Sequence, residues 1–259
     1  MISNIQITLV ETSHPGNIGA AARAMKTMGL TRLCLVRPKY FPSAEATARA
    51  SGADDILSGA RLVDSLDEAL EDCQLVVGAS NRPRTIGAPV LDACGGAQRL
   101  VTASGQGCVA LLFGREHSGL SNSELDRCHF QLTIPAVADF PSLNIAAAVQ
   151  IMAYELRLAG LSGRSETSPP VVSAVTMDEM ERFYHHLEAV LVAIEFLDPD
   201  NPRHLMRRLR RLYNRLSPDN NEMNILRGIL TAVQKQIATQ GDGQEAARAG
   251  GRHHKVRDA

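Results

Sequence analysis

The alternation of short apolar runs with helical segments over the first 160 residues constrains the fold more than any other feature. Helix-like stretches lie between the runs, most clearly residues 18–28, which Gly29 ends, and residues 143–158. Strands that alternate with helices are typical of an α/β fold with a largely parallel sheet. Five runs have the length and composition of buried strands, and a sixth is weaker: residues 5–11, 32–37, 75–79, 109–113, 130–134 and 61–63.

The chain changes character after this region. Residues 162–175 (SGRSETSPPVVSAV) are rich in Ser, Thr and Pro and have no apolar periodicity, which is typical of a linker. Beyond them only helical periodicity is present, in residues 177–196, 202–216 and 221–237. The predicted organisation is therefore an α/β domain in residues 1–161, a linker in 162–175, a helical module in 176–239 and a disordered tail in 240–259.

Composition excludes several classes of protein. The longest apolar run, residues 145–153, is broken by Gln150 and falls far short of the roughly 20 apolar residues that span a membrane. The opening MISNIQITLVE lacks the features of a signal peptide, so we expect no membrane segment and a cytoplasmic protein. The 5 cysteines have no metal-ligand spacing, which predicts reduced structural thiols and no metal.

A net charge of −1 hides one strongly basic segment. Residues 203–216 contain no acidic residue and six arginines: Arg203, Arg207, Arg208, Arg210, Arg211 and Arg215. Such a segment is a candidate phosphate-binding face. The alternative is a solvated amphipathic helix whose leucines at 205, 209, 212 and 216 face a core. The two can hold together, and we favour a functional basic surface because the leucines do not explain the lack of acidic residues.

The segment after the first predicted strand is an unusual turn. It reads HPGNIGAAAR, without the glycine patterns of a Rossmann dinucleotide site or a P-loop. Gly16, Asn17 and Gly19 form a tight turn into a helix, and Arg23 lies one turn further on. A helix N-terminus attracts anions, and the guanidinium adds a positive charge. Considered alone, the segment is more typical of a glycine turn with a surface arginine.

Two further segments follow predicted strands. In LLFGREHSGLS, residues 111–121, an apolar strand leads directly to Gly114, Arg115 and Glu116. In residues 134–151, a proline-bearing loop leads to Ser142 and a helix rich in alanine. Ligands of parallel sheets bind beyond the carboxyl ends of strands, so both are candidate binding loops. Each also has a purely structural interpretation, such as a helix cap at Ser142.

Taken together, the three segments resemble the motifs of the SpoU class of SPOUT RNA 2'-O-methyltransferases over residues 1 to about 160. The opening and the helical extension are similar in particular to bacterial tRNA methyltransferases that act at position 32 of the anticodon loop. The resemblance implies a trefoil-knotted α/β fold, S-adenosylmethionine as methyl donor, tRNA as substrate and a homodimer. A ribosomal-RNA 2'-O-methyltransferase and a non-catalytic RNA-binding protein are the alternatives.

The resemblance also implies roles for individual residues. It makes Arg23 the catalytic arginine, with Asn17 positioning Arg23 or the ribose and Ser142 touching the hydroxyl or the donor. An arginine stays protonated, so it would act by stabilising negative charge on the 2'-oxygen rather than as a base. The predicted cofactor-binding residues are Ala79, Ser80, Asn81, Gly114, Arg115, Glu116, Ile134, Ser142, Leu143 and Asn144. The predicted RNA-binding residues are Arg84, Arg115, Arg203, Arg207, Arg208 and Arg211.

Overall fold

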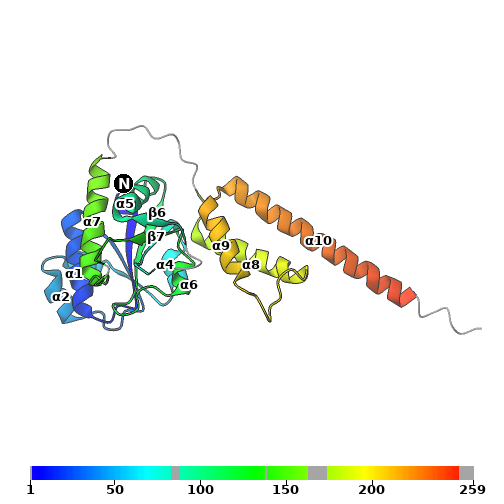
Figure 1. The fold of residues 1–259 in the computed structure, drawn as a ribbon, viewed down its shortest axis with the longest axis horizontal. Helices are drawn as coiled ribbons and strands as arrows, with labels where there is room; N and C mark the ends of the chain where they lie inside the picture. The colour runs from blue at the N-terminus through cyan, green and yellow to red at the C-terminus, as the bar shows by residue number, and fades with distance from the viewer. Residues whose placement is uncertain (1, 83–87, 138, 163–173, 251–259) are drawn as a thin grey trace, which may run out of the picture.

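The computed structural model describes residues 2–82, 88–137, 139–162 and 174–250 (Figure 1). Its centre is a seven-stranded, all-parallel sheet in the order β3-β2-β1-β6-β4-β7-β5. The strands are β1 (Ile5–Val10), β2 (Arg32–Val36), β3 (Arg61–Val63), β4 (Cys73–Ala79), β5 (Val90–Asp92), β6 (Cys108–Phe113) and β7 (Phe130–Thr133). The predicted α/β class and parallel sheet are confirmed, and β5 is an additional strand.

Helices cover both faces of the sheet, because alternate residues of each strand point to opposite sides. In β1, Ile5, Ile7 and Leu9 enter the larger core, whereas Val10 enters the smaller one. The larger core is covered by α1 (Pro15–Met28), α2 (Ala44–Ala50), α3 (Asp54–Ser58), α5 (Ala93–Ala103) and α7 (Ile145–Ser162). The smaller core is covered by α4 (Leu66–Leu70) and α6 (Asn122–Leu125).

A helical module follows, built from α8 (Met177–Ala193), α9 (Leu205–Leu216) and α10 (Asn220–Gly250). Thr176 and Glu179 form a capping box that begins α8, and Phe183 and Tyr184 are buried in the module's own core. Met177 packs into the smaller core of the sheet domain. The module therefore docks on the face that carries α4 and α6, and α10 extends away from it (Figure 1).

Two features of this module differ from expectation. Helix α10 continues to Gly250, although a disordered tail was predicted from residue 240; residues 240–250 lack apolar periodicity and contain three glycines, but residues 244–249 (QEAARA) are all good helix formers. In α9, Leu209 packs against the module core together with Met206 and Tyr213, whereas Leu212 and Leu216 are exposed. Residues 163–173 of the predicted linker, and 251–259, lie outside the described residues.

No helix in the described ranges is long and apolar enough to cross a membrane. Within the same ranges, no three His, Cys, Asp or Glu side chains are grouped so that they could hold a metal ion. All 5 cysteines are free thiols, and Cys34, Cys73 and Cys128 are buried. The trefoil knot that the resemblance implies stays a prediction.

Candidate active site

A cleft of about 350 Å³ opens at the carboxyl ends of β6, β4 and β7, which are adjacent in the sheet. The segments that follow β4 and β6 line it, together with the connection from β7 to α7. Its apolar lining includes Leu132, Ile134 and Leu143. Both the volume and the position are typical of a small-molecule site in a parallel sheet.

The cleft brings together most of the residues predicted to bind the cofactor. Of the ten, only Asn144 does not line it. The other nine come from three stretches that are far apart in the sequence: Ala79, Ser80, Asn81, Gly114, Arg115, Glu116, Ile134, Ser142 and Leu143.

Neighbouring polar groups hold the loop after β4 in place. The Ser80 amide donates to the Leu132 carbonyl at 2.9 Å, and the Ser80 carbonyl accepts from Gln131 Nε2 at 2.9 Å and Thr133 Oγ1 at 3.1 Å. Asn81 Nδ2 donates to the Pro141 carbonyl at 2.7 Å. Sequence analysis did not identify Gln131 and Thr133. The only feature that could have indicated their role is that they are polar residues within an otherwise apolar predicted strand. These bonds fix one wall of the cleft.

The loop after β6 folds back on itself at Gly114. A Cβ at this position would lie 2.1 Å from the carbonyl carbon of Gly119 and 2.2 Å from the Leu120 nitrogen. Gly119 itself has φ of 67°, the left-handed region that glycine tolerates. The loop therefore requires glycine at 114 for its own backbone packing, independently of any ligand.

Glu116 binds the start of α1. Its carboxylate accepts hydrogen bonds from the Ser13 amide at 3.1 Å, the Ser13 hydroxyl at 3.0 Å, the His14 amide at 3.2 Å and Asn17 Nδ2 at 3.0 Å. Partial burial alone would raise the pKa of Glu116, but the bonds from Asn17 and the backbone outweigh it and lower the pKa to about 2. Glu116 thus joins the first and second motifs as a carboxylate.

Asn17 and Asn144 extend this connection to the third motif. Asn144 Nδ2 donates to Asn17 Oδ1 at 3.0 Å, and Asn144 Oδ1 accepts from the Ala146 amide at 2.9 Å, which caps α7. Both ends of the Asn17 amide are therefore engaged within the protein. Its hydrogen bonds go to Glu116 and Asn144, and the predicted role of Asn17 in positioning Arg23 or the ribose stays a prediction.

Arg115 lines the cleft, but two carboxylates hold its guanidinium. Its Nε donates to Glu11 at 2.7 Å, and both terminal nitrogens donate to Glu124 at 3.0 Å. The hydrogen bonds to Glu124 and then to Glu11 raise the pKa of Arg115. Through these bonds Arg115 ties the cleft loop to α6. Its predicted RNA contact stays a prediction.

Arg23 does not line the cleft of its own chain. It lies on the exposed surface of α1, six residues beyond Asn17, which corresponds to roughly 9 Å along a helix axis. Ser142, by contrast, is exposed at the cleft itself. The remaining predicted phosphate contact near the cleft, Arg84, lies outside the described residues.

The arginines of α9 divide into two groups. Arg207 Nε forms an ion pair with Asp126 at 2.6 Å, and Arg210 pairs with Glu181 of α8. Acidic partners thus exist, but other elements supply them. Because Arg207 pairs with a carboxylate of the sheet domain, the structure does not support its predicted role as an RNA contact. The arginines of this segment that stay exposed are Arg203, Arg208, Arg211 and Arg215.

Comparison with known proteins accounts for both parts of the chain. The model of the SpoU rRNA Methylase family matches residues 4–154, more than half of the chain. The chain belongs to the SpoU methylase family. The model of the tRNA methyltransferase TrmJ C-terminal domain matches residues 178–243, which places the chain in the TrmJ group of this family.

Curated relatives are similar over nearly their whole length. The tRNA (cytidine/uridine/adenosine-2'-O-)-methyltransferase TrmJ of Pseudomonas aeruginosa is 53% identical over 245 residues, which cover 91% of this chain and 95% of the relative. The tRNA (cytidine/uridine-2'-O-)-methyltransferase TrmJ of Escherichia coli is 48% identical over 244 residues, which cover 91% of this chain and 97% of the relative. The crystal structure of TrmJ from Z. mobilis ZM4 has a TM-score of 0.77 at 34% identity, covering 88% of this chain and 98% of that one.

Proposed function

We propose that this protein transfers the methyl group of S-adenosylmethionine to the ribose 2'-hydroxyl of nucleotide 32 in the tRNA anticodon loop, as a cytoplasmic homodimer. The observation that carries the proposal is the cleft lined by the loop after β4 and by the second and third motifs, to which Asn17 of the first motif is joined by hydrogen bonds with Glu116 and Asn144. The names of the relatives supply the reaction, and the match to a TrmJ C-terminal domain supports tRNA as the substrate.

The residues of the cleft fit S-adenosylmethionine. Apolar side chains at 132, 134 and 143 suit an adenine ring, and Ser80 and Gly114 line the same space. When bound, this donor supplies an electrophilic methyl group on a sulfonium. Ala79, Ser80, Gly114, Ile134 and Leu143 would hold it, and the bonded network around Glu116 would keep the loops in place.

Ser142 and Arg23 are the proposed catalytic side chains. A ribose hydroxyl is a poor nucleophile: its oxygen must lie in line with the methyl carbon and pass its proton to solvent water or a neighbouring phosphate as the new C–O bond forms. Ser142, exposed at the cleft, would orient the hydroxyl. The positive charge of Arg23 would stabilise the developing alkoxide.

A homodimer would explain why Arg23 lies away from the cleft of its own chain. Because Arg23 does not line its own cleft, we propose that it serves the cleft of a second copy. An exposed apolar stripe on α7 supports such an interface: Tyr154, Leu158 and Leu161 are 49%, 41% and 54% exposed. These residues recur at helical spacing and would be covered in the dimer.

The alternatives have less support. A ribosomal-RNA methyltransferase would share the three motifs, but the C-terminal match is to a tRNA methyltransferase domain. A non-catalytic RNA-binding protein would need no intact cleft, whereas this cleft gathers nine of the ten predicted cofactor contacts.

Methyl transfer from tritiated donor distinguishes these functions. The full chain is incubated with unmodified tRNA or unmodified ribosomal RNA, and donor binding is measured separately by calorimetry. We expect donor binding and labelling of tRNA alone. Labelling of ribosomal RNA alone would favour the first alternative, and donor binding without any labelling would favour the second.

A further inference from the structure

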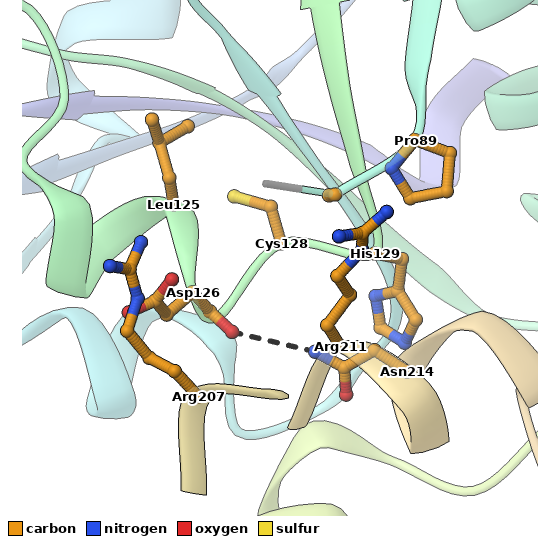
Figure 2. A pocket seen from close by; sticks show the side chains of 9 residues that line it. Pro89, Leu125, Asp126, Cys128, His129, Arg207, Arg211 and Asn214 are labelled. Carbon is orange, nitrogen blue, oxygen red and sulfur yellow. Dashed lines mark hydrogen bonds and ion pairs between the residues drawn. The ribbon is translucent and has the colours of Figure 1, made fainter. Parts of the chain in front are cut away.

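The segment directly after α6 connects the sheet domain to the helical module. Asp126 Oδ2 pairs with Arg207 Nε at 2.6 Å, and the Asp126 carbonyl accepts from Asn214 Nδ2 at 3.5 Å; Figure 2 shows Asp126 between these two side chains of α9. The next residue is Arg127, whose Nη1 lies 3.7 Å from Oε1 of Glu181 in α8. Glu181 also pairs with Arg210. Two consecutive residues therefore contact two of the three helices of the module, α9 and α8.

Helix α6 also holds the loop after β6, which forms one wall of the cleft. Glu124, in α6, binds both terminal nitrogens of Arg115 in the loop after β6. Only one residue separates Glu124 from Asp126. The cleft loop and helix α9 are thus attached to the same C-terminal end of α6, at positions two residues apart.

The contact between α6 and α9 is packed. The side chains of Arg207 and Asp126 are only 24% and 19% exposed. The cavity between them and His129, Arg211 and Asn214 is about 10 Å³, room for no more than a water molecule (Figure 2). This place is therefore a docking contact between two parts of the chain and not a ligand site.

We propose that Asp126 is a positioning residue for the RNA substrate. Its pairing with Arg207 holds α9 so that the exposed arginines of this segment face the RNA at a fixed orientation to the cleft. Arg207 serves as the partner of Asp126 and contacts no phosphate. This inference rests on the proposed function, because it assigns to the arginine face the task of holding tRNA.

Exchanging the charges of Asp126 and Arg207 distinguishes an ion pair between these two residues from a contact between Arg207 and an RNA phosphate. The single variants Asp126→Asn and Arg207→Asp break the pair, and the double variant Asp126→Arg with Arg207→Asp restores it with reversed charges. The control is Arg208→Asp, on the exposed side of the same helix. The KM for tRNA, kcat and donor affinity are measured on the full chain, with thermal unfolding to verify folding.

We expect both single variants to raise the KM for tRNA about tenfold with unchanged donor affinity, the scale of coupling between residues in contact. The double variant should regain most of the loss, whereas Arg208→Asp should weaken tRNA binding and flatten its salt dependence. If Arg207 contacts phosphate, the double variant will be as poor as Arg207→Asp, and Asp126→Asn will leave KM unchanged or lower it. That result would overturn the proposal.

Amide hydrogen exchange tests the pairing without RNA. In the full chain, exchange in residues 205–216 should rise in both single variants and return to the wild-type rate in the double variant. Unchanged exchange in the single variants would contradict the positioning role. Because this readout needs no substrate, it stays decisive even if the wild-type protein methylates no tRNA, a result that would count against the proposed function alone.

Discussion

The carboxylate of Glu116 accepts a hydrogen bond from the Asn17 amide at 3.0 Å across 99 residues of sequence. The same amide accepts from Asn144, so one side chain joins the loop after β6 to the start of α1 and the start of α7. None of these contacts points to a ligand. The three motifs are therefore held to one another by polar side chains.

Loss of the Glu116 charge should weaken the fold in a pH-dependent way. The folded pKa of about 2 lies below the ordinary 4.5, so the stabilisation is fully present above pH 4.5 and is lost as the pH falls towards 2. Glu116→Gln should cost about 1.5–3 kcal/mol at pH 7, the range for hydrogen bonds to a charged group. Denaturant unfolding of the variant and the wild type between pH 3 and pH 7 measures this difference in the free energy of unfolding.

The difference between Glu116→Gln and the wild type should narrow as the pH falls. Glu45→Gln, at an exposed carboxylate in the first turn of α2, is the control and should cost no more than the roughly 0.3–1 kcal/mol of a charge at a helix N-terminus. A Glu116→Gln variant as stable as the wild type at pH 7 would mean that the network does not hold the motifs together.

A side chain at 114 should destroy the cleft. In Gly114→Val, the Cβ overlaps the backbone of Gly119 and Leu120, so the loop must open. Donor affinity should fall beyond detection by calorimetry. Gly228→Ala is a matched control because nothing lies within 4 Å of its added Cβ; normal donor binding by Gly114→Val would mean that the pocket lies elsewhere.

Arg23→Ala should bind the donor normally and lose at least about a hundredfold in methyl transfer, the scale of removing one electrostatic stabiliser. Mixing this inactive variant with inactive Gly114→Val tests whether Arg23 acts on the partner's cleft. After subunit exchange, mixed dimers hold one complete site, so about a quarter of wild-type activity should return. No recovery despite exchange would assign Arg23 to its own cleft or to another role.

Reversal of exposed arginines in α9 should weaken tRNA binding. Arg208→Glu and Arg211→Glu remove positive charges that have no acidic partner among the described ion pairs. Removing one arginine from a phosphate should make the slope of log affinity against log salt shallower by roughly 0.7 to 0.9. Donor affinity should not change, and an unchanged dissociation constant for tRNA would reduce this face to a solvated surface.

The sequence predicted the sheet well where strands are long apolar runs, as in β1 and β6. It did not predict β5, because three residues after Pro89 show no periodicity that could be recognised. The cleft loops could be predicted because strand ends gather at one edge of a parallel sheet.

The partners of charged side chains could not be predicted in the same way. Arg115 binds Glu11, which lies 104 residues earlier in the sequence. Arg207 pairs with Asp126, which is also remote in the sequence. Sequence spacing alone does not show which carboxylate an arginine will pair with, so such arginines look available for RNA until the tertiary fold is known. Chain topology, which residue patterns do not contain, decides which arginines stay exposed.

The most direct test of the central claim uses a single missing oxygen. Two tRNA transcripts differ only at nucleotide 32, which carries either ribose or 2'-deoxyribose, and each is incubated with the full chain and methyl-labelled donor. We predict one methyl group per ribose-containing tRNA, mapped to that nucleotide, and none on the deoxy form. Equal labelling of both transcripts would contradict 2'-O-methylation at this position.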